Sequence, residues 1–351
     1  MTIYFVTNGI HRMGGTERVI LQLATILKDV VIIVPGTTMV AFNGYNNLTI
    51  KSLNISDFPA SGKFNKLFHR LRYYQALKKN IKFTSEDFVV TFSYDLNLLN
   101  IALLKSNKCK SIVCEHIEYD YHKGIRNLFR RIFYKQSGVK LVCLTKTDEI
   151  KFKNDGIDTI VIPNFIYPIK NEYKENTNKI IAVGRLEYQK NFKFLVDAFK
   201  LSKIYENGWT LEIVGEGSEY QLIDETIKLH GLDSYVKMHE FSKDIEKYYR
   251  NSSLLCMTSR FEAFPMVLLE GLNYGLPVLV SDFPTGAKEI LGAENTQIVS
   301  EYSITSYSNH LKRICYDDVL RKKYSDENLV LIKNYHPEKI AKLWIELFRD
   351  N

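Results

Sequence analysis

The sequence predicts an α/β protein made of two doubly wound domains, each with a parallel sheet between helices. Short apolar runs rich in β-branched residues alternate with helical patterns along the chain, which is typical of parallel sheets with crossover helices. The alternation breaks once, near the middle, and then starts again. At 351 residues the chain is also longer than one core usually supports.

The first half begins with an apolar run and continues in strict alternation. Its expected strands are Ile3–Thr7, Val30–Val34, Leu48–Leu53, Phe88–Phe92, Ser111–Cys114, Val139–Leu144 and Thr159–Ile162. Apolar residues at helical spacing predict helices over 15–27, 63–80, 95–106, 123–136 and 146–153.

Around 163–179 the pattern breaks into a stretch with two prolines, several asparagines and charges, which indicates a linker. The second series has expected strands at Ile180–Gly184, Thr210–Gly215, Val236–Met238, Leu254–Thr258 and Val278–Val280, with helices near 191–206, 219–230, 243–250 and 265–274. Pro337–Asp350 reads as a closing amphipathic helix. We therefore assign domains to 1–165 and 166–335, and the closing helix to 336–351.

Doubly wound domains bind small molecules at the carboxyl ends of their strands. Gly14 and Gly15 follow the first strand and precede a helix, so backbone amides there can approach an anion. The alternative is a plain tight turn. In the second half, Arg185 leaves the end of a strand and Lys190 precedes the next helix. Two cations there suit a diphosphate, because together they can neutralise a departing leaving group where other enzymes use a metal. The alternative is a solvated surface.

The segment 259–282 contains Glu262 and Glu270, eight residues apart around a predicted helix start. Glu262 would precede the helix and take sugar hydroxyls, while Glu270 would hold two ribose hydroxyls. Backbone amides in and after EAFP would face phosphate; the residues concerned are Ala263, Phe264, Pro265, Met266 and Val267. The alternative is a helix with one capping acid and one surface acid.

Three motifs in order resemble the retaining glycosyltransferases of family 4, which have the GT-B fold of two Rossmann-like domains facing a central cleft. They are GGTE at 14–17, GRLEYQKNF at 184–192 and EAFPMVLLEG at 262–271. The resemblance implies that Arg185 and Lys190 bind the diphosphate, Glu262 faces the transferred sugar and Glu270 binds ribose. It also makes Gly14 and Gly15 part of a phosphate-proximal loop.

The same resemblance extends to two further segments. CEHIEYD at 114–120 matches the family segment whose histidine lies beside the donor sugar, here His116, although a histidine at a strand end is often only structural. FPTGAKEIL at 283–291 has Ala287 in place of a proline, and Glu289 could contact the donor. VGEG at 214–217 lacks the full pattern for a nicotinamide cofactor.

The net charge of +7 is unevenly distributed. Residues 1–165 hold 23 Lys and Arg against 13 Asp and Glu, a net +10, and two basic aromatic segments lie there at 64–83 and 122–135. One interpretation is a pair of core helices, each with a solvated charged face. The alternative, which we prefer, is peripheral binding to an anionic membrane surface or a lipid pyrophosphate, with Phe68 and Phe129 inserting. No nucleic-acid module accompanies the charge, so nucleic acid is not an expected partner.

The start of the chain lacks a secretory pattern, and no apolar run approaches membrane-spanning length, so we expect a cytoplasmic protein on the inner face of the membrane. Five cysteines without paired spacing predict buried reduced thiols, and no cluster has metal-ligand spacing. We expect no cofactor and no metal.

The resemblance implies a retaining enzyme of bacterial surface-polysaccharide synthesis. It would move a hexose or N-acetylhexosamine from a nucleotide sugar, with UDP preferred, to a glycan or a polyprenyl-pyrophosphate-linked acceptor. The N-terminal domain would bind the acceptor and the C-terminal domain the nucleotide sugar. Two alternatives remain open: a GT-B sugar-nucleotide epimerase, and a non-catalytic GT-B partner subunit.

Overall fold

The computed structural model describes residues 1–12, 14–57, 62–107, 109–169, 177–242 and 244–350. The chain forms two compact units. Unit 1 comprises Met1–Asn164 and Pro337–Asn351, and unit 2 comprises Phe165–His336. The division therefore falls one residue before the expected boundary, and the closing helix is part of unit 1. Part of the expected linker, residues 170–176, lies outside the described residues.

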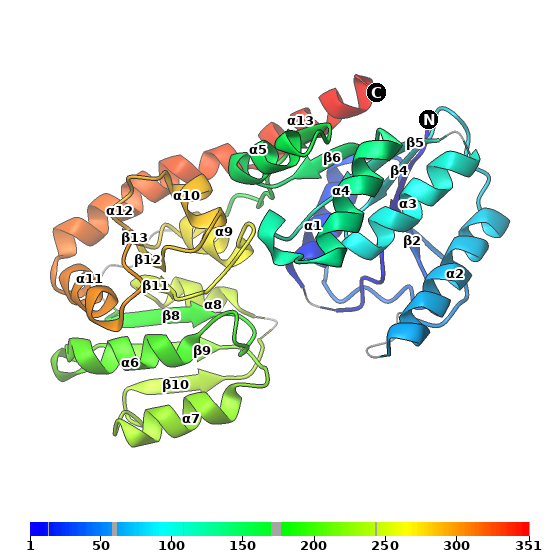
Figure 1. Ribbon diagram of the computed structural model, residues 1–351. Coiled ribbons are helices and arrows are strands. Elements are labelled where there is room, and N and C mark those ends of the chain that lie inside the picture. Colours follow the sequence, from blue (N-terminus) through cyan, green and yellow to red (C-terminus); the bar gives the residue numbers. More distant parts are fainter. Residues whose placement is uncertain (13, 58–61, 108, 170–176, 243, 351) are drawn as a thin grey trace. The chain divides into compact units, whose positions relative to one another are not determined.

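Unit 1 is built on a parallel sheet in the order β3-β2-β1-β4-β5-β6-β7. Its strands are β1 (Ile3–Val6), β2 (Val30–Val34), β3 (Thr49–Ser52), β4 (Phe88–Thr91), β5 (Lys110–Cys114), β6 (Lys140–Cys143) and β7 (Thr159–Val161). Its helices are α1 (Gly15–Leu27), α2 (Lys63–Asn80), α3 (Tyr94–Asn107), α4 (Ile125–Ser137), α5 (Lys146–Asn154) and α13 (Pro337–Arg349), with a 3-10 turn η1 at Tyr119–Tyr121. Figure 1 shows these elements along the chain.

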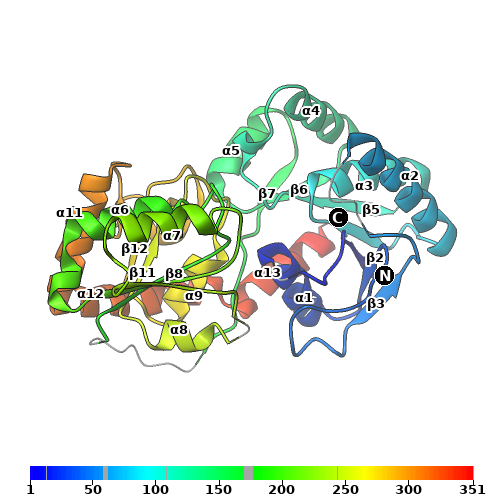
Figure 2. The ribbon, with the colours of Figure 1, turned by 90° about the horizontal axis from the view of Figure 1, so that it is seen from below.

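Helices cover both faces of this sheet, with α1 and α13 on one side and α2, α3 and α4 on the other (Figure 2). The central strand β4 is consequently buried along its whole length, which explains why its sequence is continuously apolar rather than alternating. α13 buries Ile340, Trp344 and Leu347, which form the apolar side of the expected amphipathic helix.

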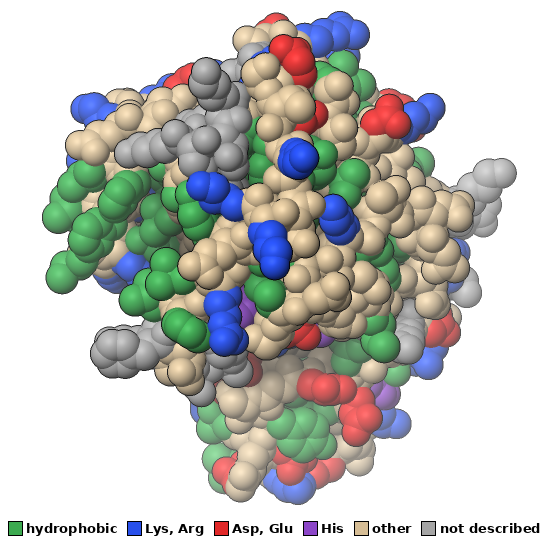
Figure 3. All heavy atoms as spheres, turned by 90° about the vertical axis from the view of Figure 1, so that its right-hand side faces the viewer, with side chains coloured by type: hydrophobic (Ala, Val, Ile, Leu, Met, Phe, Trp, Pro, Cys, Tyr) green, Lys and Arg blue, Asp and Glu red, His purple; other side chains and the backbone are tan. Residues whose placement is uncertain are grey.

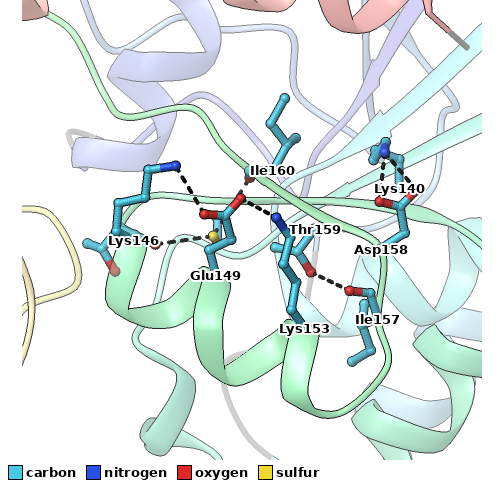
Figure 4. Close-up of polar contacts among 10 residues, drawn as sticks. Lys140, Lys146, Glu149, Lys153, Ile157, Asp158, Thr159 and Ile160 are labelled. Atoms are coloured by element: carbon cyan, nitrogen blue, oxygen red, sulfur yellow. Dashed lines mark hydrogen bonds and ion pairs between the residues drawn. The ribbon is translucent and has the colours of Figure 1, made fainter.

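Polar contacts hold the β7 edge of this sheet (Figure 4). The Glu149 carboxylate of α5 accepts from Lys146 at 3.1 Å and from Lys153 at 2.9 Å. On the neighbouring strands, Lys140 pairs with Asp158 at 2.6 Å. In each pair one of the two side chains is more than half exposed, so each pair contributes about 1 kcal/mol at most to stability.

Unit 2 is a second parallel sheet in the order β10-β9-β8-β11-β12-β13. Its strands are β8 (Lys179–Val183), β9 (Thr210–Val214), β10 (Val236–His239), β11 (Leu254–Met257), β12 (Val278–Ser281) and β13 (Ile298–Val299). Its helices are α6 (Phe192–Ser202), α7 (Tyr220–Leu229), α8 (Glu246–Arg250), α9 (Met266–Asn273), α10 (Gly286–Leu291), α11 (Ile304–Tyr316) and α12 (Asp318–Leu331), with 3-10 turns η2 (Ile204–Asn207) and η3 (Ile332–Tyr335).

The core of unit 2 lies where α6, α7 and α11 pack on the sheet, and α9 and α12 pack together elsewhere in the same unit. Phe199, Trp209 and Tyr307 are among the buried aromatic side chains of that core. All five cysteines of the chain are buried and free, as their positions in and around apolar runs predicted.

The expected strands and helices match the structure to within a few residues at most ends. Between 283 and 336 no element was expected, but the structure has α10, β13, α11, α12 and η3 there. The first basic segment forms α2. In α2 the buried residues include His69, Tyr73 and Leu77, whereas Leu67, Phe68 and Leu71 are exposed.

Candidate active site

The strand order of unit 2 reverses between β8 and β11. From β8 the following strands β9 and β10 add in one direction, and from β11 the strands β12 and β13 add in the other. Ligands of doubly wound sheets bind at the carboxyl ends of the strands beside such a reversal. The loop after β8 carries Arg185 and Lys190, and the loop after β11 carries Glu262. The two loops that the sequence singled out therefore leave the two strands that flank the reversal.

Lys190 and Glu262 meet directly across this reversal. The Lys190 Nζ lies 2.5 Å from the Glu262 Oε1, and the two side chains are only 13% and 11% exposed. The Ser259 hydroxyl donates to the same carboxylate oxygen at 3.1 Å. A charge-assisted contact of this length fixes both side chains more firmly than an exposed ion pair does. The site thus presents one held cation and one held carboxylate at the edge of the sheet.

The β11 loop is fixed by the loop that follows β12. Thr285 donates its hydroxyl to the Glu262 carbonyl at 2.7 Å and lies 3.3 Å from the Ala263 carbonyl. Gly286 lets the two loops approach closely, because a Cβ at that position would lie 2.6 Å from the Pro265 ring and 2.7 Å from the Ala263 carbonyl oxygen. The loop that follows β12 therefore sets the shape of the turn before α9.

α9 starts at Met266, with Pro265 as its N-cap. Pro265 was expected inside the first turn, and it lies one position earlier. The amides of Met266 and Val267 open the helix, and the first amides of a helix have no intrahelical acceptor. Together with the positive end of the helix dipole, such amides favour an anion at this end. The geometry is suited to a phosphate group close to the Glu262 turn.

The β8 loop rests on the VGEG segment that follows β9. A Cβ on Gly215 would lie 1.9 Å from the Gly184 carbonyl oxygen, and one on Gly217 would lie 2.4 Å from the Leu186 carbonyl oxygen. Gly184 has φ +152°, and a Cβ there would meet Lys190 Cε at 2.9 Å. The glycines of VGEG thus allow close packing of two loops, so that Lys190 can lie across Gly184.

Arg185 projects from the same loop and is exposed. Its guanidinium reaches Gln189 Oε1 at 3.5 Å, and Gln189 donates to the Phe261 carbonyl at 2.9 Å. Gln189 therefore connects the β8 loop to the β11 loop. This places Arg185 near the Lys190 site without locking it, which leaves its donors available to an oxyanion.

Glu270 lies in α9 and pairs with a different residue. The Tyr249 hydroxyl, which is buried at the end of α8, donates to the Glu270 Oε2 at 2.6 Å. Tyr249 in turn stacks on Tyr274 with ring centroids 5.1 Å apart. The carboxylate of Glu270 is thus held in place by a buried tyrosine.

In unit 1 the strand order reverses between β1 and β4. Gly14 follows β1 as the N-cap of α1, and Gly15 is the first helical residue. A Cβ on Gly14 would lie 2.2 Å from the Glu17 carboxylate. The acid of the GGTE motif therefore folds back over the helix start, and the glycine provides the room for it.

His116 follows β5 in the same unit. Its ring lies 5.7 Å from the Phe92 ring, centroid to centroid. Loss of solvent around the ring lowers the pKa of His116 to about 4, so the imidazole is neutral near pH 7. A neutral imidazole can exchange hydrogen bonds with a hydroxyl group but adds no charge.

Glu115, the residue before His116, is fully buried. Its Oε1 accepts from the Tyr134 hydroxyl at 2.6 Å, and Asn97 donates to that tyrosine oxygen at 2.9 Å. Burial raises the pKa of Glu115, against the opposing effect of the Arg130 charge. This network ties the His116 loop to α3 and α4.

The structure brings Lys190, Glu262, Ala263 and Pro265 together, with Arg185 on the adjoining loop. Phe264 packs its ring against Tyr335 at 5.6 Å, so its side chain is a core group. Glu289 lies in α10, where its carbonyl accepts from the Tyr335 hydroxyl at 3.1 Å. Gly14, Gly15 and His116 belong to unit 1.

Within the described ranges, no group of three or more His, Cys, Asp or Glu side chains is arranged to hold a metal ion. Over the same ranges, no helix is both long and apolar enough to cross a membrane.

Comparison with known proteins decides the family. The family described as "Glycosyl transferases group 1" matches residues 165–329. Over 372 aligned residues the chain is 30% identical to the amylovoran biosynthesis glycosyltransferase AmsD of Erwinia amylovora, covering 98% of this chain and 99% of that protein. The chain belongs to the group 1 glycosyltransferases.

Two further comparisons place this glycosyltransferase. It is 23% identical to a Campylobacter jejuni α-1,4-N-acetyl-D-galactosaminyltransferase whose name gives a diphospho-undecaprenol-linked glycan as its acceptor, over 96% of this chain and 95% of that protein. Among solved structures, Anabaena HepE in complex with UDP and glucose matches with a TM-score of 0.80 at 14% identity, covering 100% of both chains. The expected GT-B fold, with a doubly wound sheet in each unit, is confirmed. The resemblance to family 4 surface-polysaccharide glycosyltransferases is confirmed as well.

Sequence reasoning missed several residues that shape this glycosyltransferase site. They are Ser259, Thr285, Gly286, Gln189 and Tyr249, which contact the Glu262 turn, the β8 loop or Glu270. The PTG letters at 284–286 did carry a signal, but only the fold reveals that Thr285 binds backbone carbonyls of the Glu262 turn. Tyr249 gives no local signal, because its partner is 21 residues away.

Proposed function

We propose that this glycosyltransferase moves a hexose or N-acetylhexosamine from a UDP-sugar to a lipid-linked glycan in bacterial surface-polysaccharide synthesis, with retention of anomeric configuration and without a metal. Unit 2 would bind the sugar nucleotide and unit 1 the acceptor. The observation that carries the proposal is the contact of Lys190 with Glu262 beside the start of α9.

The chemistry of this pair fits a departing nucleotide diphosphate. Glu262 would accept hydrogen bonds from sugar hydroxyls, and Lys190 would supply a cation for the diphosphate. Arg185 adds a planar donor on the same loop. In the reaction, the bond from the anomeric carbon to the phosphate oxygen breaks while the acceptor oxygen bonds to the same face of that carbon. The acceptor's proton passes to the leaving phosphate, so that UDP and the glycoside are the products.

The proposed absence of a metal rests on charge. Two protein cations and the first amides of α9 can offset the negative charge that develops on the diphosphate. We therefore expect transfer to continue at an unchanged rate in EDTA. A loss of turnover in EDTA that Mg²⁺ or Mn²⁺ restores would contradict this part of the proposal.

The preference for UDP is supported by the HepE complex with UDP and glucose, a protein of the same fold. Its identity to this chain is low, so the nucleotide must be tested directly. Thermal shift with UDP, GDP, ADP and dTDP, followed by their sugars, is the simplest screen. We expect the largest shift with UDP, and a larger shift with GDP would overturn the choice.

The lipid-linked acceptor is supported by the relatives' names. One is an amylovoran biosynthesis enzyme, and the other transfers to a diphospho-undecaprenol-linked glycan. Such an acceptor lies at a membrane surface, which fits peripheral attachment at the cytoplasmic leaflet through the basic first half of the chain. Changing Lys63, Lys66, Arg70 and Arg72 to Glu should reduce binding to anionic vesicles at low salt, because each basic residue near such a surface contributes about 1 kcal/mol. Equal binding by this variant would remove the electrostatic argument.

Release of UDP tests the function as a whole. The enzyme is incubated with a UDP-sugar, with and without membranes that contain lipid-linked glycans. Acceptor-dependent UDP release together with sugar on the lipid fraction supports transfer. Conversion of the UDP-sugar without any acceptor would indicate the epimerase alternative instead.

A further inference from the structure

The amphipathic helix α4 exposes its apolar side to solvent and buries polar residues in unit 1. Ile125, Leu128, Phe129, Ile132 and Phe133 recur at i, i+3, i+4, i+7 and i+8, which makes one continuous apolar stripe. Each of these side chains is between 39% and 72% exposed. The residues that α4 buries are Arg130 and Tyr134. A helix of a soluble protein ordinarily turns its apolar stripe to the core, so this stripe faces outward for a different reason.

Buried polar contacts prevent α4 from rotating about its axis. Arg130 donates to the Tyr119 carbonyl at 2.7 Å, and its guanidinium stacks on the Phe152 ring at 4.9 Å. One turn later, Tyr134 donates to buried Glu115 at 2.6 Å. Rotation would break these bonds and leave buried polar groups without partners, at a cost of several kcal/mol. The outward stripe is therefore a fixed feature of unit 1.

α2 adds three exposed apolar residues beside this stripe. Both α2 and α4 pack against α3, and Asp95 of α3 pairs with Arg70 of α2 at 2.5 Å and with Arg126 of α4 at 3.3 Å. Leu67, Phe68 and Leu71 are each more than half exposed. The side of the molecule that carries α2 has hydrophobic side chains gathered near Lys and Arg (Figure 3). We name the docking face by its eight residues: Leu67, Phe68, Leu71, Ile125, Leu128, Phe129, Ile132 and Phe133.

We propose that the docking face inserts into the interface of an anionic phospholipid bilayer, with the α4 stripe as the main contact. This rests on the proposed function, because a lipid-linked acceptor brings the enzyme to that surface. An interfacial helix needs a long apolar stripe with basic residues at its edges. α2 contributes six Lys and Arg, α4 contributes three besides the buried Arg130, and neither helix contains Asp or Glu. The Arg72 guanidinium lies 4.7 Å from the Phe68 ring, a combination that suits the boundary between headgroups and acyl chains.

A second copy of this chain fits the same face poorly. A two-fold symmetric contact would bring each basic edge against its equivalent. The nearby acids cannot relieve that repulsion, because Asp95 is engaged by Arg70 and Arg126, and Asp155 by Arg131 at 2.7 Å. Anionic phosphates of a bilayer supply the missing opposite charge. A bilayer also adapts to a convex helix surface, whereas a protein partner would need a matching groove.

The test compares two triple variants by vesicle sedimentation. L128S/F129S/F133S removes the centre of the α4 stripe. L229S/V319S/V330S is the matched control, because those three apolar residues of unit 2 are even more exposed. The vesicles are phosphatidylcholine with and without phosphatidylglycerol, at low ionic strength and at about 1 M salt, where the Debye length is about 3 Å. UDP-induced thermal shift and circular dichroism are measured in parallel.

We expect wild type and control to bind anionic vesicles, with a fraction that survives high salt because apolar insertion is not screened. The α4 variant should bind about tenfold or more weakly and lose the salt-resistant fraction, while it keeps its UDP shift. If that variant does not fold, I125S/L128S gives a milder version of the same test. The proposal is overturned if wild type ignores anionic vesicles, or if the α4 variant binds them as wild type does. A wild-type dimer that the α4 variant dissociates, without vesicle binding, would also overturn it.

These readouts separate the proposal from the donor site. Loss of vesicle binding with an intact UDP shift concerns the docking face alone. Absence of any UDP shift in wild type, with normal vesicle binding, would count against the proposed donor instead.

Discussion

The ammonium group of Lys190 lies 2.5 Å from the Glu262 carboxylate, across the point where the strand order of unit 2 reverses. The two residues lie on loops that follow different strands, and each loop is supported by another segment. VGEG supports the Lys190 loop, and Thr285 supports the Glu262 turn. The pair is therefore a product of the fold and not of neighbouring sequence. Under the proposed function, the sugar diphosphate would bind beside these two opposite charges.

A double-mutant cycle measures this pair. Lys190→Met and Glu262→Gln should each destabilise the protein by about 1–3 kcal/mol, because each leaves one mostly buried polar partner behind. The double variant should lose less than the sum, since neither charge is then left alone. Urea unfolding followed by tyrosine and tryptophan fluorescence gives the values. Strictly additive losses would show that the two groups do not interact in solution.

Tyr249→Phe tests the support of Glu270. The change removes a hydroxyl that donates at 2.6 Å, so the carboxylate keeps its position less well. We expect KM for the sugar nucleotide to rise about threefold to tenfold, in line with one lost hydrogen bond, and kcat to change little. Tyr248→Phe, which removes the hydroxyl from the adjacent residue, is the control. A KM that does not respond would separate Glu270 from nucleotide binding.

The pH dependence of stability follows from His116. Its pKa is lowered from 6.5 to about 4 on folding, so the unfolded chain binds the proton more tightly. The stabilisation is fully present above pH 6.5 and is lost as pH falls from 6.5 toward 4. The loss is at most about 3 kcal/mol. His116→Gln should flatten this part of the stability curve relative to wild type, and NMR titration of the ring gives the pKa itself. An imidazole that titrates near 6.5 would contradict the burial argument.

Gly286→Ala tests the contact that shapes the Glu262 turn. The added methyl would meet the Pro265 ring and the Ala263 carbonyl at under 3 Å, so the turn before α9 must shift. We expect a stability loss of about 1–3 kcal/mol and a higher donor KM. Gly286→Ser should be worse in both respects. Steady-state kinetics measures the donor KM, and thermal melts measure the stability. An unchanged KM in both variants would mean that the shape of this turn does not affect donor binding.

Much of the fold was predictable, because parallel strands buried on both faces are continuously apolar and their helices keep a 3.6-residue period. The region from 283 to 336 was not assigned, although part of the signal was present. α11 has a Ser303 N-cap and buries Tyr307, Leu311 and Ile314 at helical spacing. β13 has only two residues and could not be recognised from its sequence.

The site was predictable as motifs but not as contacts. Spacing put Lys190 and Glu262 on separate loops, and only the strand order brings those loops together. The orientation of α4 was even less accessible. Its apolar stripe is plain in the sequence, but whether it faces in or out depends on Arg130 and Tyr134 finding buried partners at Tyr119 and Glu115. Those partners are set by tertiary structure.

The most direct test of the central claim is UDP release by Lys190→Ala, with Lys193→Ala as the matched control. Lys193 follows Lys190 by three residues but pairs with Asp197 at 2.7 Å, away from Glu262. Both variants and wild type are assayed with a UDP-sugar, EDTA and acceptor-containing membranes, and their folding is checked by circular dichroism. The account predicts that Lys190→Ala lowers acceptor-dependent turnover on the order of a hundredfold or more while Lys193→Ala stays near wild type. A folded Lys190→Ala enzyme with near-normal turnover would contradict it.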